Sequence, residues 1–276
     1  MMAQTRQVDY GARQYDPAIA RWNRTDPMAE NFYILSTYHY CCNNPIIHID
    51  LYGCATGDYY SLEGKWLGSD GKKDDKVYVA SDVEKNEKDI VVSSINSKEL
   101  PFTHSKFRRM AATVYGESSA FKENKMTTEL KKEMFAIASV HHNHPKAKAY
   151  GATSDKAKQY LNKSPAGINN DIFKKTANAA ILNAVLGEHD YSNGAFAWDG
   201  IEQSYYSDDD KRTNADNFEL HKNTLGWNIS DEHYEKWKSY VGPRFKAPQR
   251  SESVKGKVYY QSTAVYLGTI FWKKYE

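Results

Sequence analysis

The stretch K-F-R-R-M-A-A-T-V-Y-G-E-S-S-A-F, residues 106–121, decides how this chain folds. Its apolar positions recur at the spacing i, i+3, i+4 and i+7, the period of an amphipathic helix; they are Phe107, Met110, Ala111 and Val114. Thr103 stands just before the stretch as an N-cap, and Gly116 is a helix stop signal. The pattern predicts a helix that buries one apolar face.

Glu117 extends this apolar stripe three residues past Val114, at the C-terminal end of the helix. Burial disfavours a carboxylate there, and the negative end of the helix dipole repels one. Both effects predict a raised pKa, and a carboxylic acid that keeps its proton near neutral pH is what glycoside cleavage needs as a general acid. Periodicity alone also allows a glutamate that only frays a helix end in solvent.

The residue types around Glu117 carry a resemblance to enzymes that cut the bacterial cell wall. Y-G-E-S-S-A-F, residues 115–121, resembles the Glu-Ser motif of lysozyme-like lytic transglycosylases, in which the glutamate is the only catalytic acid. Three blocks resemble, in order, the spore-cortex-lytic type of cell-wall hydrolases: V-Y-G-E at 114–117, A-I-A-S-V-H-H-N-H at 136–144 and G-A-F-A-W-D-G at 194–200. In the second block His144 replaces the usual arginine, and the gap before it is longer than usual.

This resemblance implies a fold, a catalytic residue and a set of substrate contacts. The fold is α+β: a mainly helical, lysozyme-like catalytic domain over residues 100–276, with short strands at its C-terminal end. Glu117 is the implied catalytic acid. The implied substrate-binding residues are Tyr115, Ser118, Asn143, Phe196, Trp198 and Asp199.

Residues 1–54 resemble a different family, the associated core at the end of Rhs/YD-repeat proteins. The motifs that carry this resemblance are Y-G-A-R-Q-Y-D-P at 10–17, R-W at 21–22, D-P-M-A-E at 26–30, Y-H-Y at 38–40 and N-N-P at 43–45. In that family the core precedes a variable C-terminal toxin, which implies a secretion-system carrier and a cognate immunity protein. The core normally ends in Asp-Pro-x-Gly, linked to self-cleavage, but here Leu51 replaces the proline, and a vestigial fragment without activity is the alternative.

The remaining elements follow from periodicity and turn chemistry. Residues 55–99 are expected to be a connector with short strands, including a hairpin around Asp70-Gly71 that joins residues 66–67 to residues 76–80. Further helices are expected over 128–142, over 170–186 with Gly187 at C′, and after Ser230. The C-terminal residues 257–266 and 269–272 are expected to be two strands joined near Leu267-Gly268.

Composition limits the partners and cofactors of the chain. It has 276 residues with 37 basic and 35 acidic side chains, a net charge of +2, which does not indicate a dedicated nucleic-acid binder. Its three cysteines, Cys41, Cys42 and Cys54, lack zinc spacing. His141 and His144 at i, i+3 lack a further ligand set, so neither a metal nor another cofactor is expected.

The expected function is cleavage of peptidoglycan glycan strands by an antibacterial toxin. A lytic transglycosylase needs one acid, whereas a hydrolase usually needs a second carboxylate, for which Asp190, Asp199 and Glu202 are candidates. The N-terminus has no apolar signal core and no apolar run approaches a membrane span, so export by a dedicated system and action in the target-cell periplasm are expected. A nuclease-type toxin and a non-enzymatic Rhs fragment are the alternatives from other functional classes.

Overall fold

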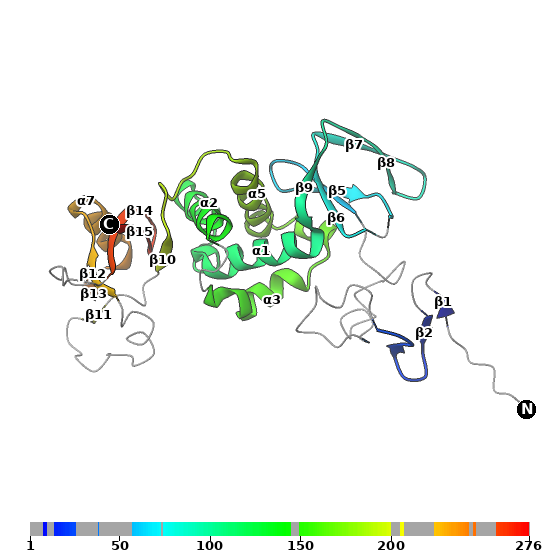
Figure 1. Ribbon diagram of the computed structural model, residues 1–276, viewed down its shortest axis with the longest axis horizontal. Coiled ribbons are helices and arrows are strands. Elements are labelled where there is room, and N and C mark those ends of the chain that lie inside the picture. The colour runs from blue at the N-terminus through cyan, green and yellow to red at the C-terminus, as the bar shows by residue number, and fades with distance from the viewer. Residues whose placement is uncertain are drawn as a thin grey trace, which may run out of the picture. The chain divides into compact units, whose positions relative to one another are not determined.

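The computed structural model of the chain describes residues 8–9, 14–25, 38, 57–72, 74–144, 149–199, 205–206, 224–242, 245–246 and 258–275. Over these residues the fold is α+β, with six α-helices and several small sheets (Figure 1). The chain divides into two compact units: one takes in the residues up to Arg108 together with Lys163–Asn169, the other Arg109–Asn162 and Asn170–Glu276. No helix among the described residues is long and apolar enough to cross a bilayer.

A three-stranded antiparallel sheet opens the first unit, with β1 (Val8–Asp9), β2 (Gln14–Asp16) and β3 (Arg21–Trp22) in that order. Trp22 is 2% exposed, and its ring meets that of Tyr15 edge-on at 5.9 Å between centroids. The ring contact in this sheet therefore joins two of the Rhs-like motifs, since Tyr15 belongs to one and Trp22 to the other. Most of the other motif residues of 1–54 lie outside the described residues.

A four-stranded sheet follows in the order β5-β4-β6-β9, built from β4 (Asp58–Tyr60), β5 (Trp66–Ser69), β6 (Lys76–Val79) and β9 (Lys98–Thr103). The hairpin expected around Asp70-Gly71 is wrong, because β4 lies between β5 and β6 and pairs in parallel with β6, Asp58 opposite Val77. The turn of the real hairpin, β4–β5, spans residues 61–65. A second hairpin pairs β7 (Asp82–Lys85) with β8 (Val91–Ile95), and α4 (Pro165–Ile168) belongs to the same unit.

Helix α1 (His104–Glu117) begins in the first unit and ends in the second. Thr103 Oγ1 accepts a hydrogen bond from Lys106 N at 3.1 Å, which confirms the expected N-cap. Phe107, Ala111 and Val114 are fully buried, as the apolar spacing predicted. The helix ends one residue beyond Gly116, so Glu117 is its last residue.

In the second unit, α2 (Thr128–Asn143) packs against α5 (Ile172–Leu186) around a core that includes Leu130, Met134, Ile137 and Ile181. The expected C-cap of α5 is confirmed, since Gly187 adopts the left-handed conformation with φ 73°. In the sequence, η3 (Ser119–Phe121) lies between α1 and α2, whereas η4 (Tyr150–Thr153) and α3 (Asp155–Leu161) lie between α2 and α5.

A four-stranded sheet closes the second unit in the order β10-β15-β14-β12, formed by β10 (Ala197–Asp199), β12 (Thr224–Asn228), β14 (Val258–Tyr266) and β15 (Thr269–Tyr275). The strands β14 and β15 form the expected hairpin at Leu267-Gly268. Helix α7 (Asp231–Val241) begins at the expected cap Ser230 and contributes Trp237, fully buried beside Ile270 and Trp272. The short strands β11 (Tyr205–Tyr206) and β13 (Phe245–Lys246) pair with each other.

Candidate active site

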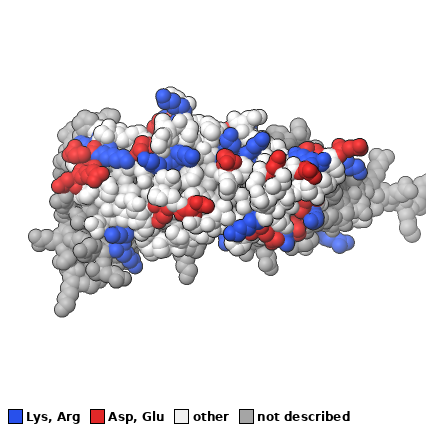
Figure 2. All heavy atoms as spheres, turned by 90° about the horizontal axis from the view of Figure 1, so that it is seen from above, with Lys and Arg blue, Asp and Glu red and all other residues white. Residues whose placement is uncertain are grey.

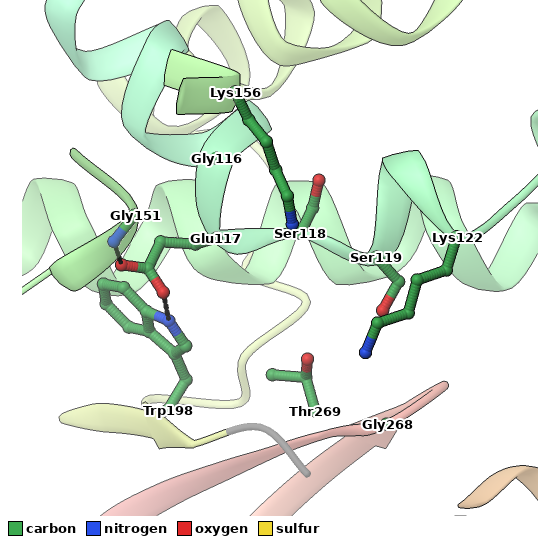
Figure 3. A pocket seen from close by; sticks show the side chains of 10 residues that line it. All are labelled: Gly116, Glu117, Ser118, Ser119, Lys122, Gly151, Lys156, Trp198, Gly268 and Thr269. Atoms are coloured by element: carbon green, nitrogen blue, oxygen red, sulfur yellow. Dashed lines mark hydrogen bonds between the residues drawn. The ribbon is translucent and has the colours of Figure 1, made fainter. Parts of the chain in front are cut away.

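The C-terminal end of α1 opens into a pocket with a volume of about 210 Å³ (Figure 3). Five parts of the second unit meet there: the turn after α1, η4, the start of α3, strand β10 and the β14–β15 turn. The lining residues are Gly116, Glu117, Ser118, Ser119, Lys122, Gly151, Lys156, Trp198, Gly268 and Thr269. Segments far apart in the sequence thus surround one carboxylate.

Two donors hold the half-buried Glu117 carboxylate in place. The backbone N–H of Gly151 donates to Oε1, and the indole Nε1–H of Trp198 donates to Oε2 at 3.2 Å (Figure 3). Hydrogen bonds to both oxygens stabilise the ionised carboxylate and offset its repulsion by the negative end of the α1 dipole. The expectation of a retained proton considered burial and the helix dipole, but not these two hydrogen bonds.

Two glycines make this arrangement sterically feasible. A Cβ on Gly151 would lie 2.7 Å from the backbone N of Glu117, and a Cβ on Gly116 would lie 2.4 Å from the carbonyl oxygen of Gly151. Both distances are shorter than the closest approach of a Cβ atom to a backbone atom, so a side chain at either position would clash and push η4 away from α1. Gly116 therefore allows a close approach of two backbones as well as standing near the helix end.

Glu133 lies behind the pocket and was not predicted from the sequence. This α2 residue is 0% exposed, and its Oε1 accepts hydrogen bonds from Ser119 Oγ at 2.8 Å and Thr269 Oγ1 at 2.6 Å. Its Oε2 accepts from Ser119 N at 2.8 Å. Burial raises the pKa of Glu133 to about 7, against the opposing effect of these hydrogen bonds. The carboxyl ties two walls of the pocket together, because Ser119 and Thr269 both line it.

The sequence does contain a signal for Glu133. It follows Leu130 by three residues and precedes Ile137 by four, so it belongs to the apolar face of α2. A carboxyl within such a face must be buried with hydrogen-bond partners or deform the helix packing. No comparable local signal marks Gly151 or Thr269, which reach the pocket through long-range folding.

Two lysines also line the pocket. Lys156, at the start of α3, places its Nζ over the ring of Phe121 at 3.2 Å from the centroid. Burial, and then the charge of Lys122, lower the pKa of Lys156, while Glu117 and Glu133 act in the opposite direction. The pocket therefore brings two ammonium groups to the same cavity as Glu117.

Two of the residues expected to bind substrate, Ser118 and Trp198, are among the described residues that line the pocket. Ser118 is buried, accepts from Ala120 N at 3.4 Å and donates to Tyr115 O at 3.1 Å, so its hydroxyl is engaged in the turn after α1. Trp198 comes from the third motif block and contacts Glu117 of the first. The structure brings these two blocks together.

The other expected contacts are not among the pocket residues. Tyr115 is 9% exposed and packs beside Tyr160, with Lys174 Nζ 4.8 Å from its ring centroid. Asn143 is the exposed last residue of α2. Phe196 is half-buried and packs against His144, with ring centroids 4.5 Å apart.

Of the candidate second carboxylates, Asp190 is not among the described residues that line the pocket. Asp190 accepts from Ser192 N at 2.8 Å and from Gly194 N at 2.9 Å; burial opposes its ionisation, but these hydrogen bonds prevail and lower its pKa. It organises the loop between α5 and β10. Asp199 belongs to β10, where its backbone pairs opposite Ile270, and Glu202 lies outside the described residues. Within the described part of the chain, no group of three or more His, Cys, Asp or Glu side chains could hold a metal ion.

No family model, curated protein or solved structure matches this chain. Function therefore has to be inferred from the chemistry of the pocket and from the motifs that meet in it.

Proposed function

We propose that the second unit is a lysozyme-like domain that cleaves the glycan strands of peptidoglycan, with Glu117 as its catalytic acid. The observation that carries this proposal is the hydrogen bond from Trp198 Nε1 to Glu117 Oε2, which joins residues 81 positions apart in the sequence. The two residues belong to separate blocks of the cell-wall hydrolase motif. Their meeting in one pocket is what a shared role in catalysis requires.

The pocket offers the chemistry that glycoside cleavage needs. Gly151 fixes Oε1 of Glu117, so Oε2 is the oxygen that would carry the proton to a glycosidic oxygen. The indole Nε1–H of Trp198 donates a hydrogen bond to Oε2. A sugar that displaces the indole removes a donor that favours the ionised form, and thereby assists proton uptake at Oε2.

A transglycosylase reaction fits this site better than hydrolysis through a second carboxylate. After the acid protonates the leaving oxygen, the 6-hydroxyl of the muramoyl ring closes intramolecularly on the oxocarbenium-like centre, so no activated water is needed. Among the described residues that line the pocket, Glu117 is the one carboxylate, and Glu133 is 0% exposed behind the wall.

The Rhs-like motifs of residues 1–54 suggest the biological setting. We propose that the chain is an antibacterial effector that a dedicated secretion system carries to the periplasm of a target cell, and that a cognate immunity protein neutralises it. The described part of these motifs includes the three-stranded sheet β1–β3.

Digestion of purified sacculi, with mass spectrometry of the soluble products, tests the proposed reaction. We expect muropeptides with anhydro-muramoyl ends. Reducing ends would show hydrolysis instead, and no release from sacculi would refute glycan cleavage. Degradation of DNA or RNA by the same preparation would favour a nuclease.

Expression with and without a periplasmic leader tests the site of action. A wall-cleaving enzyme is toxic only where it meets the wall, so we expect lysis with the leader and normal growth without it. Equal toxicity from the cytoplasm would contradict this setting.

A further inference from the structure

The half-buried residue between η4 and α3 is Ser154, and its hydroxyl makes two hydrogen bonds. It accepts from Ala157 N at 3.2 Å, which is the usual bond of an N-cap serine. It also donates to the carbonyl oxygen of Gly151 at 2.6 Å. A cap does not need this second bond, which joins the start of α3 to the residue whose N–H donates to Glu117 Oε1.

The carbonyl oxygen of Gly151 receives two donors from the same residue. The backbone N–H of Ser154 lies 3.1 Å from it, and the hydroxyl lies closer, at 2.6 Å. Ser154 therefore fixes the carbonyl side of Gly151, while the N–H side of the same glycine holds the Glu117 carboxylate.

The hydroxyl and the carbonyl both pack against Gly116, the residue before Glu117 on α1. A Cβ at Gly116 would lie 2.4 Å from Gly151 O and 2.8 Å from Ser154 Oγ. The absence of a side chain at Gly116 thus leaves room for this hydroxyl–carbonyl pair. Three elements, α1, η4 and α3, interlock beside the carboxylate, where Figure 3 shows Gly116, Gly151 and Glu117 close together.

Charged groups from three other parts of the second unit border or back the same pocket. They are Lys122 after η3, Lys156 in α3 and Glu133 in α2. Lys156 stands two residues after Ser154, so a test has to separate its charge from the effect of the hydroxyl. More distant charges matter less, because salt screens charges beyond about 10 Å. On the face seen in Figure 2, basic and acidic side chains of the described residues are also interspersed.

We propose that Ser154 is a positioning residue for Glu117 and acts through Gly151. Its hydroxyl holds η4 at the distance from α1 at which the Gly151 N–H meets Oε1, and this bond favours the ionised carboxylate. Ser154 is not among the described residues that line the pocket, and none of the quoted motifs contains it. The inference rests on the proposed function, in which Glu117 is the acid, and adds a residue that controls its proton affinity.

Carboxyl ¹³C NMR titration of the full chain tests this role without any substrate. Labelled glutamate reports each carboxyl group, and the signal missing from Glu117→Gln assigns Glu117. In Ser154→Ala the donor to Oε1 is displaced, so the midpoint of the Glu117 titration should move to higher pH by at least about half a unit, a threefold change in proton affinity. The alkaline limb of the cleavage profile should move in the same direction.

Two further variants separate the hydroxyl from the helix cap. Ser154→Thr keeps the hydroxyl and should keep the wild-type midpoint. Ser154→Gly lacks the hydroxyl, but glycine is an acceptable N-cap, so this variant should be more stable than Ser154→Ala and show the same shift. Thermal melts of every variant show whether it is folded.

Two controls separate the hydroxyl from general destabilisation and from charge. Ser164→Ala removes another N-cap serine, which accepts from Gly167 N at 3.1 Å in the first unit, and should leave the Glu117 midpoint unchanged. In a Lys156→Gln background, Ser154→Ala should still produce its shift. A shift that vanishes in this background would assign the effect to the lysine and overturn the proposal.

An unchanged Glu117 midpoint in folded Ser154→Ala and Ser154→Gly would also overturn the positioning role. This outcome is distinct from the outcome for the proposed reaction. If the midpoint depends on the Ser154 hydroxyl but sacculi are not cleaved, the positioning role stands and the catalytic proposal fails. If sacculi are cleaved but the midpoint does not depend on the hydroxyl, the catalytic proposal stands and the positioning role is refuted.

Discussion

The two ends of helix α1 both carry a titratable side chain among polar partners, yet they differ in accessibility. At the N-terminal end, His104 Nδ1 lies 2.9 Å from Asp58 Oδ2 and His104 Nε2 lies 2.8 Å from the hydroxyl of Tyr60. All three residues are at most 7% exposed. At the C-terminal end, Glu117 is half-buried and borders the pocket.

This difference distinguishes a structural network from a candidate site. The N-terminal residues pair with one another and are shielded from solvent, so their hydrogen bonds stabilise the start of the helix. Asp75 lies at the same end of the helix and accepts a hydrogen bond from Ser105 N at 3.1 Å. Burial raises the pKa of Asp75, and the interaction with His104 acts in the opposite direction. At the C-terminal end the partners of Glu117 orient it toward a cavity that a ligand can enter.

Gly151→Ala should have the largest effect on the pocket. The new Cβ would lie 2.7 Å from Glu117 N, so η4 must shift and the N–H donor to Oε1 shifts with it. We expect glycan cleavage to fall by about a hundredfold and the free energy of unfolding by about 1–3 kcal/mol. Ala152→Ser, an exposed change in the same turn, is the control. Wild-type cleavage by Gly151→Ala would show that the close approach of η4 is not needed.

Glu133→Gln should change how stability depends on pH. The pKa of Glu133 is raised in the folded protein from 4.5 to about 7, so the folded state binds more protons than the unfolded state between these values. Stability should therefore fall as pH rises through this window, by on the order of 3 kcal/mol. The amide can accept from Ser119 N while its NH₂ group donates to the hydroxyls, so the variant should lack this loss.

Urea unfolding at pH 5 and pH 8 measures this effect, with Glu129→Gln as the control on the same helix. Glu129 pairs with Lys236 at 2.8 Å and Lys132 at 3.3 Å. Burial opposes its ionisation but the lysines prevail and lower its pKa, so its stabilisation is lost only as pH falls. A Glu133→Gln variant with the pH dependence of wild type would contradict the buried, protonated carboxyl.

Trp198→Phe should have a smaller effect, on the pH profile of cleavage. The phenyl ring keeps an aromatic wall but lacks the N–H that donates to Glu117 Oε2. Losing a donor to the ionised form favours the protonated acid, so the alkaline limb of the rate profile should move to higher pH. An unchanged limb would show that the indole does not control the proton of Glu117.

Replacement of the α2 histidines should have the smallest effect. His141→Ala, His142→Ala and His144→Ala should each leave cleavage within about threefold of wild type, and EDTA should not inhibit, since the proposed reaction is proton transfer from a carboxylic acid. Sacculus digestion with and without EDTA measures this. Activity lost in EDTA and restored by zinc would reveal a metal site at the end of α2.

The sequence predicted those parts of the fold that depend on neighbouring residues. The cap Thr103, the C′ glycine Gly187 and the cap Ser230 act within one turn of their helices, so residue type and spacing are sufficient to find them. The β14–β15 hairpin is local in the same sense.

The sequence did not predict features that depend on distant pairing. The parallel pair β4–β6 places Asp58 opposite Val77, and no short-range pattern specifies which strand inserts between β5 and β6. Likewise, Gly151 and Thr269 enter the pocket only after η4 and the β14–β15 turn have packed. Motif resemblance identified Glu117 and Trp198 at the pocket but also named Asn143 and Phe196, which are not among its lining residues.

Sacculus digestion by Glu117→Gln, compared with Asp58→Asn at the other end of α1, tests the central claim most directly. The first variant should melt like wild type yet cleave at least about a hundredfold more slowly, because glutamine cannot donate a proton as the acid does. The second should lose about 1–3 kcal/mol of stability, since Asp58 is buried against His104, but cleave at the wild-type rate per folded molecule. Wild-type cleavage by a stably folded Glu117→Gln would show that Glu117 is not the catalytic acid.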